Sequence, residues 1–278
     1  MRTTIGVAEI DALIEGGVPR GAAVLVAGEA GTGKSVLCLE FILAGIREGE
    51  PGVYVTADEP GRVLETAASL GWDLRGAIDD GYARIVQVLP PGSAMPATAQ
   101  AAVAGASAGG AASAGGAAPG AAAAGNAPLP MPGANGTAAA AAPSMGTMGG
   151  GPAAATIALV AEATSEIQAE RVAIDPALGP GASGEAAAAF IADLLRGVLE
   201  ETHCTTMITG QRLHGALGLT RLGIEEQLVD GIVDLRLVER DGKRNRVISV
   251  RAMHGTRVDL DDHVFSITAG RGFVMDES

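Results

Sequence analysis

The sequence predicts an α/β fold in which a mainly parallel sheet is flanked by helices. Short apolar runs alternate with helix-length segments along the chain, and this alternation builds parallel sheets with helices on both faces. A glycine-rich loop stands between the first apolar run and the first long helical segment. Near the end of the chain, strand patterns come in pairs separated by turn residues, which predicts C-terminal β-hairpins.

The first elements surround the glycine-rich loop. A short amphipathic helix is expected at residues 7–14, followed by a turn at 16–21. The apolar run 22–27 has the character of a buried parallel strand, and the segment 36–44 that of a buried helix. Between them the sequence GEAGTGKS fits the phosphate-loop pattern G-x-x-x-x-G-K-[ST]. A glycine-rich turn that binds nothing would also fit the bare pattern, but the flanking strand and helix favour a phosphate site.

The chemistry of phosphate binding explains the residue types in this loop. Glycines let successive N–H groups point at phosphate oxygens, and the helix that follows adds the partial positive charge of its N-terminus. Lys34 would reach the β- and γ-phosphates, and the hydroxyl of Ser35 would ligate Mg²⁺. The residues expected to bind the nucleotide are Gly28, Glu29, Ala30, Gly31, Thr32, Gly33, Lys34, Ser35 and Val36.

The remaining elements continue the alternation and then give way to hairpins. Each expected strand is a short run rich in apolar and β-branched residues, and each expected helix is a longer segment without a breaker. The expected helices are 62–70, 157–170 and 184–202, and the expected strands are 53–56, 83–88, 171–175, 205–211, 231–239, 245–253, 264–268 and 272–275.

The tract 90–155 interrupts this pattern. It contains no charged residue and consists mainly of Ala, Gly, Pro, Ser and Met. Small side chains bury little surface, so ordering such a tract costs more conformational entropy than its packing returns. Because regular structure resumes afterwards, we expect a disordered insertion within a single domain that spans residues 1–278. A weak interaction role for the tract stays open.

The composition limits the partners and the compartment. The formal net charge is −13, and Lys34 and Lys243 are the only lysines. An acidic, lysine-poor surface suits a salt-rich cytoplasm and predicts a halophilic source, although a GC-rich genome also favours arginine and alanine. The acidic balance disfavours nucleic acid as the main partner.

Cysteine use and the N-terminus agree with a cytoplasmic location. Cys38 and Cys204 lie in apolar segments without paired spacing, which predicts buried thiols in a reducing compartment. The N-terminus has no signal-peptide pattern, and the long uncharged tract is broken too often by Gly and Pro to span a membrane.

Polar residues follow several of the expected strands, and parallel strands end at the same edge of a sheet. Asp175 would bind Mg²⁺ directly or through water, with a helix or turn cap as the alternative. Asp58 and Glu59 would position or deprotonate the attacking water, or else form a solvated turn. Gln211 would sense the γ-phosphate, or else simply end a strand.

Together these segments resemble the KaiC-like branch of the RecA-superfamily ATPases. The resemblance implies a RecA-like P-loop NTPase core that binds ATP between the subunits of a homo-oligomeric ring, usually a hexamer. It also implies a regulatory or signalling role with an unknown protein partner. The stretches that carry it are Gly6–Gly21, the phosphate loop, Pro51–Thr56 with the acidic pair after it, Gly71–Leu74, Gly223–Glu226, Asp230–Val233 and Gly255–Thr256.

Two departures from the family pattern lie at strand ends. The family's acidic pair is typically two glutamates, whereas the first acid here is Asp58, one methylene shorter. The residue after the strand-end aspartate is commonly serine, whereas Pro176 here lacks both a hydroxyl and a backbone donor.

A third departure concerns the cations that reach the neighbouring subunit's γ-phosphate. The family commonly carries Lys-x-Arg-Gly-Thr, and alignment on Gly255–Thr256 puts Ala252 and His254 at the cationic positions. Arg251 and Arg257 flank the motif out of register. Loss of a trans cation removes much of the stabilisation of the transition state in phosphoryl transfer. ATP binding is therefore better supported than fast hydrolysis.

The leading hypothesis is a cytoplasmic Mg-ATP-binding ATPase that hydrolyses slowly at subunit interfaces and acts as a regulatory switch. The choice of ATP over GTP rests on the resemblance. A non-catalytic module that holds ATP to stabilise an assembly is the first alternative, favoured by Ala252 and His254. A recombinase-like DNA-binding ATPase is the second, and it is disfavoured because residues 176–189 carry one acidic and no basic side chain.

Overall fold

A computed structural model describes residues 1–88, 152–179, 182–213, 218–240 and 242–276. One compact unit, formed by residues 1–94 and 150–278, contains all of them. The predicted disorder of the alanine-rich tract lies outside the described residues as far as position 151. Its last four residues, 152–155, belong to a helix and not to the insertion.

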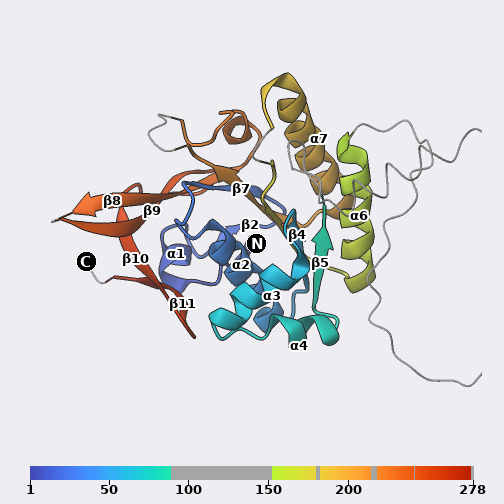
Figure 1. The fold of residues 1–278 in the computed structure, drawn as a ribbon, viewed down its shortest axis with the longest axis horizontal. Helices are drawn as coiled ribbons and strands as arrows, with labels where there is room; N and C mark the ends of the chain where they lie inside the picture. The colour runs from blue at the N-terminus through green and yellow to red at the C-terminus, as the bar shows by residue number, and fades with distance from the viewer. Residues whose placement is uncertain (89–151, 180–181, 214–217, 241, 277–278) are drawn as a thin grey trace, which may run out of the picture. The chain divides into compact units, whose positions relative to one another are not determined.

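Within the described residues, a nine-stranded sheet forms the centre of the fold (Figure 1). The strands are β3 (Ala23–Gly28), β4 (Gly52–Thr56), β5 (Ala83–Gln87), β6 (Arg171–Asp175), β7 (Thr205–Gln211), β8 (Gly231–Arg240), β9 (Lys243–Met253), β10 (His263–Thr268) and β11 (Gly272–Met275). Their order is β11-β10-β9-β8-β3-β7-β6-β4-β5. The six strands from β8 to β5 are parallel, and β8 to β11 pair antiparallel as hairpins. The predicted α/β fold, with a mainly parallel sheet and C-terminal hairpins, is confirmed.

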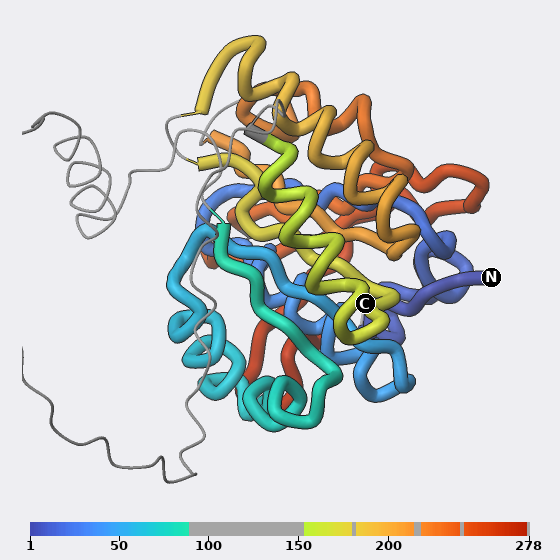
Figure 2. The backbone as a smooth tube through the Cα atoms, turned by 90° about the vertical axis from the view of Figure 1, so that its right-hand side faces the viewer, coloured from blue at the N-terminus to red at the C-terminus, as the bar shows by residue number. Residues whose placement is uncertain are grey.

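Helices cover the two faces of the parallel part. One buried cluster joins one face of the sheet to α1, α2, α3 and α4, and a second joins the other face to α6 and α7. Figure 2 shows α6 and α7 lying against each other on their side of the sheet. The helices are α1 (Ala8–Ala12), α2 (Lys34–Glu48), α3 (Pro60–Ser69), α4 (Leu74–Asp79), α6 (Pro152–Ile167) and α7 (Gly184–Thr202), with a 3₁₀ turn η1 (Glu225–Gln227).

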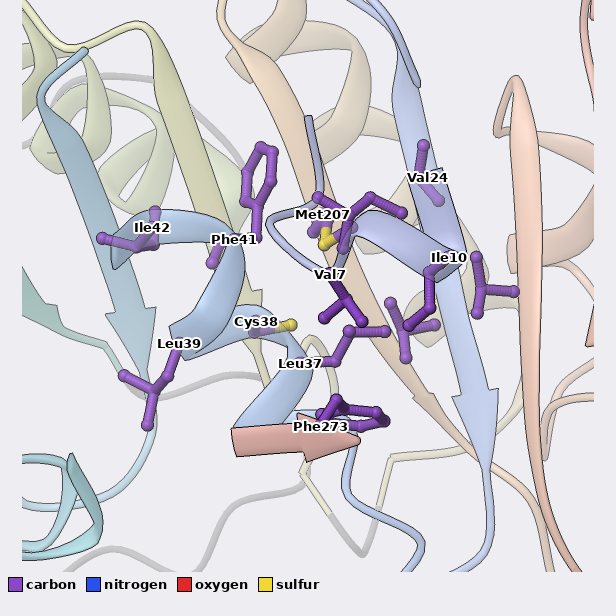
Figure 3. Close-up of a cluster of buried hydrophobic side chains, with 14 of the residues drawn as sticks. Val7, Ile10, Val24, Leu37, Cys38, Leu39, Phe41, Ile42, Met207 and Phe273 are labelled. Atoms are coloured by element: carbon purple, nitrogen blue, oxygen red, sulfur yellow. The ribbon is translucent and has the colours of Figure 1, made fainter. Parts of the chain in front are cut away.

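The apolar run of β3 is continuous because both of its faces are buried. Val24 and Val26 belong to the cluster on the α2 side, whereas Leu25 belongs to the cluster on the α7 side. Alternate residues of a strand point to opposite faces, so a strand in the middle of a covered sheet needs apolar residues at every position. Figure 3 shows the α2 side, where Leu37 and Cys38 belong to the packed apolar cluster.

A buried arginine anchors the end of α2 that lies away from the glycine-rich loop. Arg171, the first residue of β6, is fully buried, and its guanidinium donates to Glu48 at 2.6 Å and Glu50 at 2.8 Å. It also donates to the backbone carbonyls of Thr4 and Phe41. A buried charge is tolerated when it is paired and its donors are satisfied. These bonds tie the start of the chain, the end of α2 and the sheet together.

Several elements differ from the expectation. The pair β1 (Arg2–Thr3) and β2 (Val18–Pro19) and the helix α4 were missed, because two-residue strands and a six-residue helix give no periodicity. Helix α6 begins at residue 152, five residues before the expected start, because its alanines resemble the featureless tract before them. Alanine is nevertheless the best helix former.

No helix among the described residues is both long enough and apolar enough to cross a lipid bilayer.

We predict that a short Gly-Ser linker in place of residues 97–151 leaves thermal stability and nucleotide affinity nearly unchanged. Strand β5, which precedes the tract, packs against helix α6, which follows it, so a short linker can join the two elements. The length of a flexible loop changes its closure entropy only slowly. Thermal unfolding and nucleotide titration of both proteins provide the check. A Tm lowered by roughly 8 °C, which is at least ~2 kcal/mol in a domain of this size, would show that the tract packs on the domain.

Candidate functional site

The glycine-rich loop connects β3 to α2 and curls tightly over the N-terminus of that helix. Gly31 and Gly33 have φ angles of 79° and 111°, a region that side chains other than glycine rarely adopt. The hydroxyl of Thr32 donates to the carbonyl oxygen of Glu29 at 2.9 Å, which closes the curl. The sequence therefore places glycines where the backbone needs them, and the first turn of α2 opens towards the loop.

Lys34 turns its ammonium group into the loop. Its Nζ donates to the carbonyl oxygens of Gly28 at 2.9 Å and Glu29 at 2.8 Å. Burial lowers the pKa of Lys34 from its usual range, while the negative charge of Asp175 acts in the opposite direction. Neutral carbonyls are weaker partners for an ammonium group than phosphate oxygens are. The side chain is thus held where an incoming phosphate would replace the carbonyls.

The C-terminal strands pack closely against the loop and restrict its position. A Cβ at Gly28 would lie 2.6 Å from the carbonyl oxygen of Leu235 on β8, and a Cβ at Gly33 would lie 2.7 Å from Ile267 on β10. Arg246 of β9 donates to the carbonyl oxygen of Gly31 at 3.3 Å. Sequence reasoning missed Arg246, because nothing in the local pattern of β9 shows that its side chain reaches the loop.

The outer residues of the loop are open to solvent. Ala30, Gly31 and Ser35 are exposed, while Glu29 and Val36 are partly buried. Ser35 is the second residue of α2, so its hydroxyl lies at the positive end of the helix dipole. These are the positions at which a phosphate and its counter-ion would meet water.

Asp175 ends β6 at the same edge of the sheet. It is buried and lies opposite Thr56 of β4 in the parallel register. Tyr54 donates its hydroxyl to Oδ2 of Asp175 at 2.7 Å, and Thr209 donates its hydroxyl to Oδ1 at 2.7 Å. Burial and the adjacent Asp175 raise the pKa of Tyr54 well above its usual range, so its hydroxyl remains a donor at neutral pH.

The acidic pair and Gln211 occupy neighbouring strand ends. Asp58 and Glu59 follow β4, and both are exposed. The backbone N–H of Asp58 donates to the hydroxyl of Thr56 at 3.0 Å, and Thr56 lies opposite Asp175, so the acidic pair begins beside that carboxylate. Gln211 ends β7 opposite Gly28, the first residue of the loop, and is exposed. The fold therefore brings the ends of β3, β4, β6 and β7 to one edge.

The donors at this edge fit a magnesium-nucleotide complex. No group of three or more His, Cys, Asp or Glu side chains that could hold a metal by itself occurs among the described residues. Mg²⁺ does not need such a cage, because proteins usually bind it through one or two oxygen ligands together with substrate phosphates and water. Ser35 and Asp175 offer oxygen donors of that kind at this edge.

The positions aligned with the family's trans cations lie at the other end of the parallel strands, where β3 begins and not where it leads into the loop. Ala252 pairs with Ile232, and the N–H of His254 donates to the carbonyl of Asp230, beside the start of β3. The loop begins at Gly28, five residues further along β3. Since a strand rises about 3.3 Å per residue, this separates the two ends by roughly 16 Å. Side chains here cannot reach the loop of their own chain.

Arg251, next to these positions, is bound within its own chain. The register between β8 and β9 shifts between Ile232 and Val233, so Arg251 lies at a bulge. Its Nε and a terminal nitrogen donate to Asp234 at 3.1 and 2.9 Å. Asp234 is fully buried and also accepts a hydrogen bond from Arg212. Arg257, the other flanking arginine, is exposed.

Both cysteines of the chain are described, and both are buried free thiols as expected. Cys38 lies one helical turn beyond Lys34 on α2, and burial raises its pKa well above the usual range. A thiol in this state is a poor nucleophile, so Cys38 serves as an apolar part of the core beneath the loop.

Comparison with known proteins agrees with this geometry. A crystal structure of a KaiC-like protein from the archaeon Pyrococcus horikoshii superposes with a TM-score of 0.71, covering 100% of this chain and 99% of the other at 24% identity, which supports the fold. A UPF0273 protein of Methanopyrus kandleri is 27% identical over 96% of this chain and 89% of its own length.

The circadian clock oscillator protein KaiC of Synechococcus elongatus is also 27% identical over 96% of this chain, which spans 42% of that longer protein. The model of the KaiC ATPase family matches residues 3–105 and 148–278. Because these residues make up most of the sequence, the chain belongs to the KaiC family of ATPases.

Proposed function

We propose that this protein binds Mg-ATP at the carboxyl edge of its parallel sheet and hydrolyses it slowly between the subunits of a homo-oligomeric, hexameric ring. The nucleotide state then acts as a regulatory switch for a protein partner. The observation that carries the proposal is the ammonium group of Lys34, held inside the loop by two carbonyls, with Asp175 at the end of β6, two strands away from β3 at the same edge of the sheet. Membership of the KaiC ATPase family supports ATP as the nucleotide.

Each residue of the site has a role that its position supports. The N–H groups of the loop and Lys34 bind the β- and γ-phosphates, and Ser35 and Asp175 hold Mg²⁺, which neutralises charge on the phosphates. Glu59, with Asp58, orients the attacking water and accepts its proton; both carboxylates are exposed at the site. Gln211, opposite the first residue of the loop, contacts the γ-phosphate.

We expect slow hydrolysis because of the residues at the strand ends away from the loop, where Ala252 and His254 lie. That end of the strands lies away from the loop of its own chain, so it serves only the loop of a neighbouring subunit in a head-to-tail ring. It offers the neighbour no lysine or arginine at the two aligned positions, and Arg251 is engaged by Asp234. Without a trans cation, charge on the γ-phosphate is less well stabilised in the transition state.

We also assign the protein to a reducing cytoplasm, as a single domain that carries the tract 90–155 as an insertion. Two buried free thiols support the reducing compartment, and the net charge of −13 supports a salt-rich one. The missing cations at Ala252 and His254 also favour a second function, in which ATP is held only to stabilise the assembly.

One experiment tests the proposal and separates the two functions. Size-exclusion chromatography with light scattering is run in high salt with and without Mg-ATP, and phosphate release is measured on the same samples. Assembly into a ring with slow, measurable release of phosphate supports the ATPase. Assembly without release above the buffer background supports the non-catalytic module, and a monomer that ignores Mg-ATP contradicts both.

We predict that Lys34→Ala lowers ATP affinity at least ~100-fold without unfolding the protein. A hydrogen bond to a charged partner contributes roughly 1.5–3 kcal/mol, and Lys34 would make such bonds to more than one phosphate oxygen. Titration with a fluorescent ATP analogue measures the affinity, and circular dichroism checks the fold. Lys243 is the only other lysine and is exposed, so Lys243→Ala serves as the matched control. Equal affinities of Lys34→Ala and wild type would contradict the site.

We predict that Ala252→Lys combined with His254→Arg increases the rate of hydrolysis at least about tenfold at a matched state of assembly. The two cations would stabilise charge on the neighbour's γ-phosphate, although an inserted pair should fall short of the 10³–10⁵ that a native arginine finger supplies. Phosphate release measures the rate. Thr268→Arg with Ala269→Lys adds the same charges at the exposed end of β10 and the residue after it, and serves as the control. A wild type already as fast as the double variant would show that another cation stabilises the charge on the γ-phosphate.

A further inference from the structure

The carboxylate of Asp175 is held by two hydroxyl groups from the strands on either side of it. In the order β7-β6-β4, Asp175 ends the middle strand. Tyr54 of β4 donates to one oxygen and Thr209 of β7 donates to the other, each at 2.7 Å. Each oxygen thus has one donor, and the two donors fix the plane of the carboxylate from opposite sides.

Neither hydroxyl is explained by the packing around it. Tyr54 is 3% exposed, and its ring belongs to the apolar cluster between the sheet and α2, where the ring of a phenylalanine would fill the same space. Thr209 is also 3% exposed, and valine has the same shape. Polar atoms are buried at a cost unless they are hydrogen-bonded. The carboxylate of Asp175 is the partner that compensates this cost for both side chains, through one oxygen each.

The placement of the two residues follows from the register. Thr56 lies opposite Asp175, and Tyr54 lies two residues earlier on β4, so its side chain points to the same face as that of Asp175. Thr209 follows Ile208, which pairs with Ile174, and so it stands beside Asp175 on the other flank. The pairing of the parallel strands therefore places both donors beside Asp175, and no loop residue is needed for this.

We propose that Tyr54 and Thr209 are positioning residues that orient Asp175 towards the magnesium ion of the bound nucleotide. They set the affinity of the site for the divalent cation and leave the affinity for the nucleotide alone unchanged. This inference rests on the proposed function, because it deepens the role of Asp175 at the same site. Groups that orient a metal ligand through hydrogen bonds commonly change metal affinity or activity by 10–100-fold when they are removed.

The test separates cation binding from nucleotide binding. Tyr54→Phe, Thr209→Val and the double variant are titrated with a fluorescent ADP analogue in EDTA, and then with Mn²⁺ or Mg²⁺ at fixed ADP. Tyr82→Phe removes an exposed hydroxyl, and Thr206→Val removes a buried one on the same strand that contacts the carbonyl of Cys204 instead. Thr209→Ser keeps the hydroxyl and serves as the rescue variant.

We expect the half-saturating cation concentration to rise about tenfold or more in each single variant, and further in the double variant. The ADP affinity in EDTA should stay within about twofold of wild type, with Thr209→Ser and both controls close to wild type. Electron paramagnetic resonance of Mn²⁺ gives an independent readout of the cation that does not depend on hydrolysis.

Two results with the variants would overturn the inference, and two with the wild type would contradict its premises. One is an unchanged half-saturating cation concentration in both folded single variants. The other is a parallel loss of ADP affinity in EDTA, which would show a general loosening of the site. A wild type that binds ADP equally well with and without cation also contradicts the role of Asp175, while the nucleotide site itself stands. A wild type that binds no ADP under either condition contradicts the proposed function as well.

Discussion

The structure depends on the register of four parallel strands at the centre of the sheet. Gly28 lies opposite Gln211, and Thr56 lies opposite Asp175, so the phosphate loop, the amide and the buried carboxylate meet at one edge. A slip of one residue would turn Asp175 to the other face of the sheet and away from Lys34. Both faces of these strands are packed against helices, so a slip would also move each side chain into the cluster on the other face, where the space is shaped for a different residue.

Helix α2 begins at the end of the loop, so the contacts that hold this helix on the sheet also hold the loop. At its far end, the buried guanidinium of Arg171 binds Glu48 and Glu50 and fixes the helix to the start of β6. On its flank, the buried Glu40 accepts the backbone N–H of Phe273 in β11, and burial raises the pKa of that carboxyl. The helix that begins at Lys34 is therefore held from both sides before any nucleotide binds, which preorganises the loop.

Much of this arrangement could be predicted from the sequence, because the strongest signals were local. The strands 171–175 and 205–211 and the helix 184–202 have the predicted bounds, since turn residues and changes in apolar period mark their ends. The partners of Asp175 could not be predicted, because Tyr54 and Thr209 are ordinary strand residues until three strands are brought together. Arg246 was missed for the same reason, since its contact with Gly31 joins residues 215 positions apart. The one local signal for Tyr54 was a hydroxyl on a residue between two valines, two residues before the strand end.

A crystal structure of the protein with Mg-ADP tests the central claim most directly, that the carboxyl edge of the sheet is a magnesium-nucleotide site. We expect the β-phosphate to lie inside the loop and Nζ of Lys34 to leave the carbonyls of Gly28 and Glu29 to bind it. We also expect a magnesium ion beside Ser35, on the side of Asp175. A nucleotide bound elsewhere, or Lys34 still bound to the two carbonyls in a nucleotide-saturated crystal, would contradict the claim.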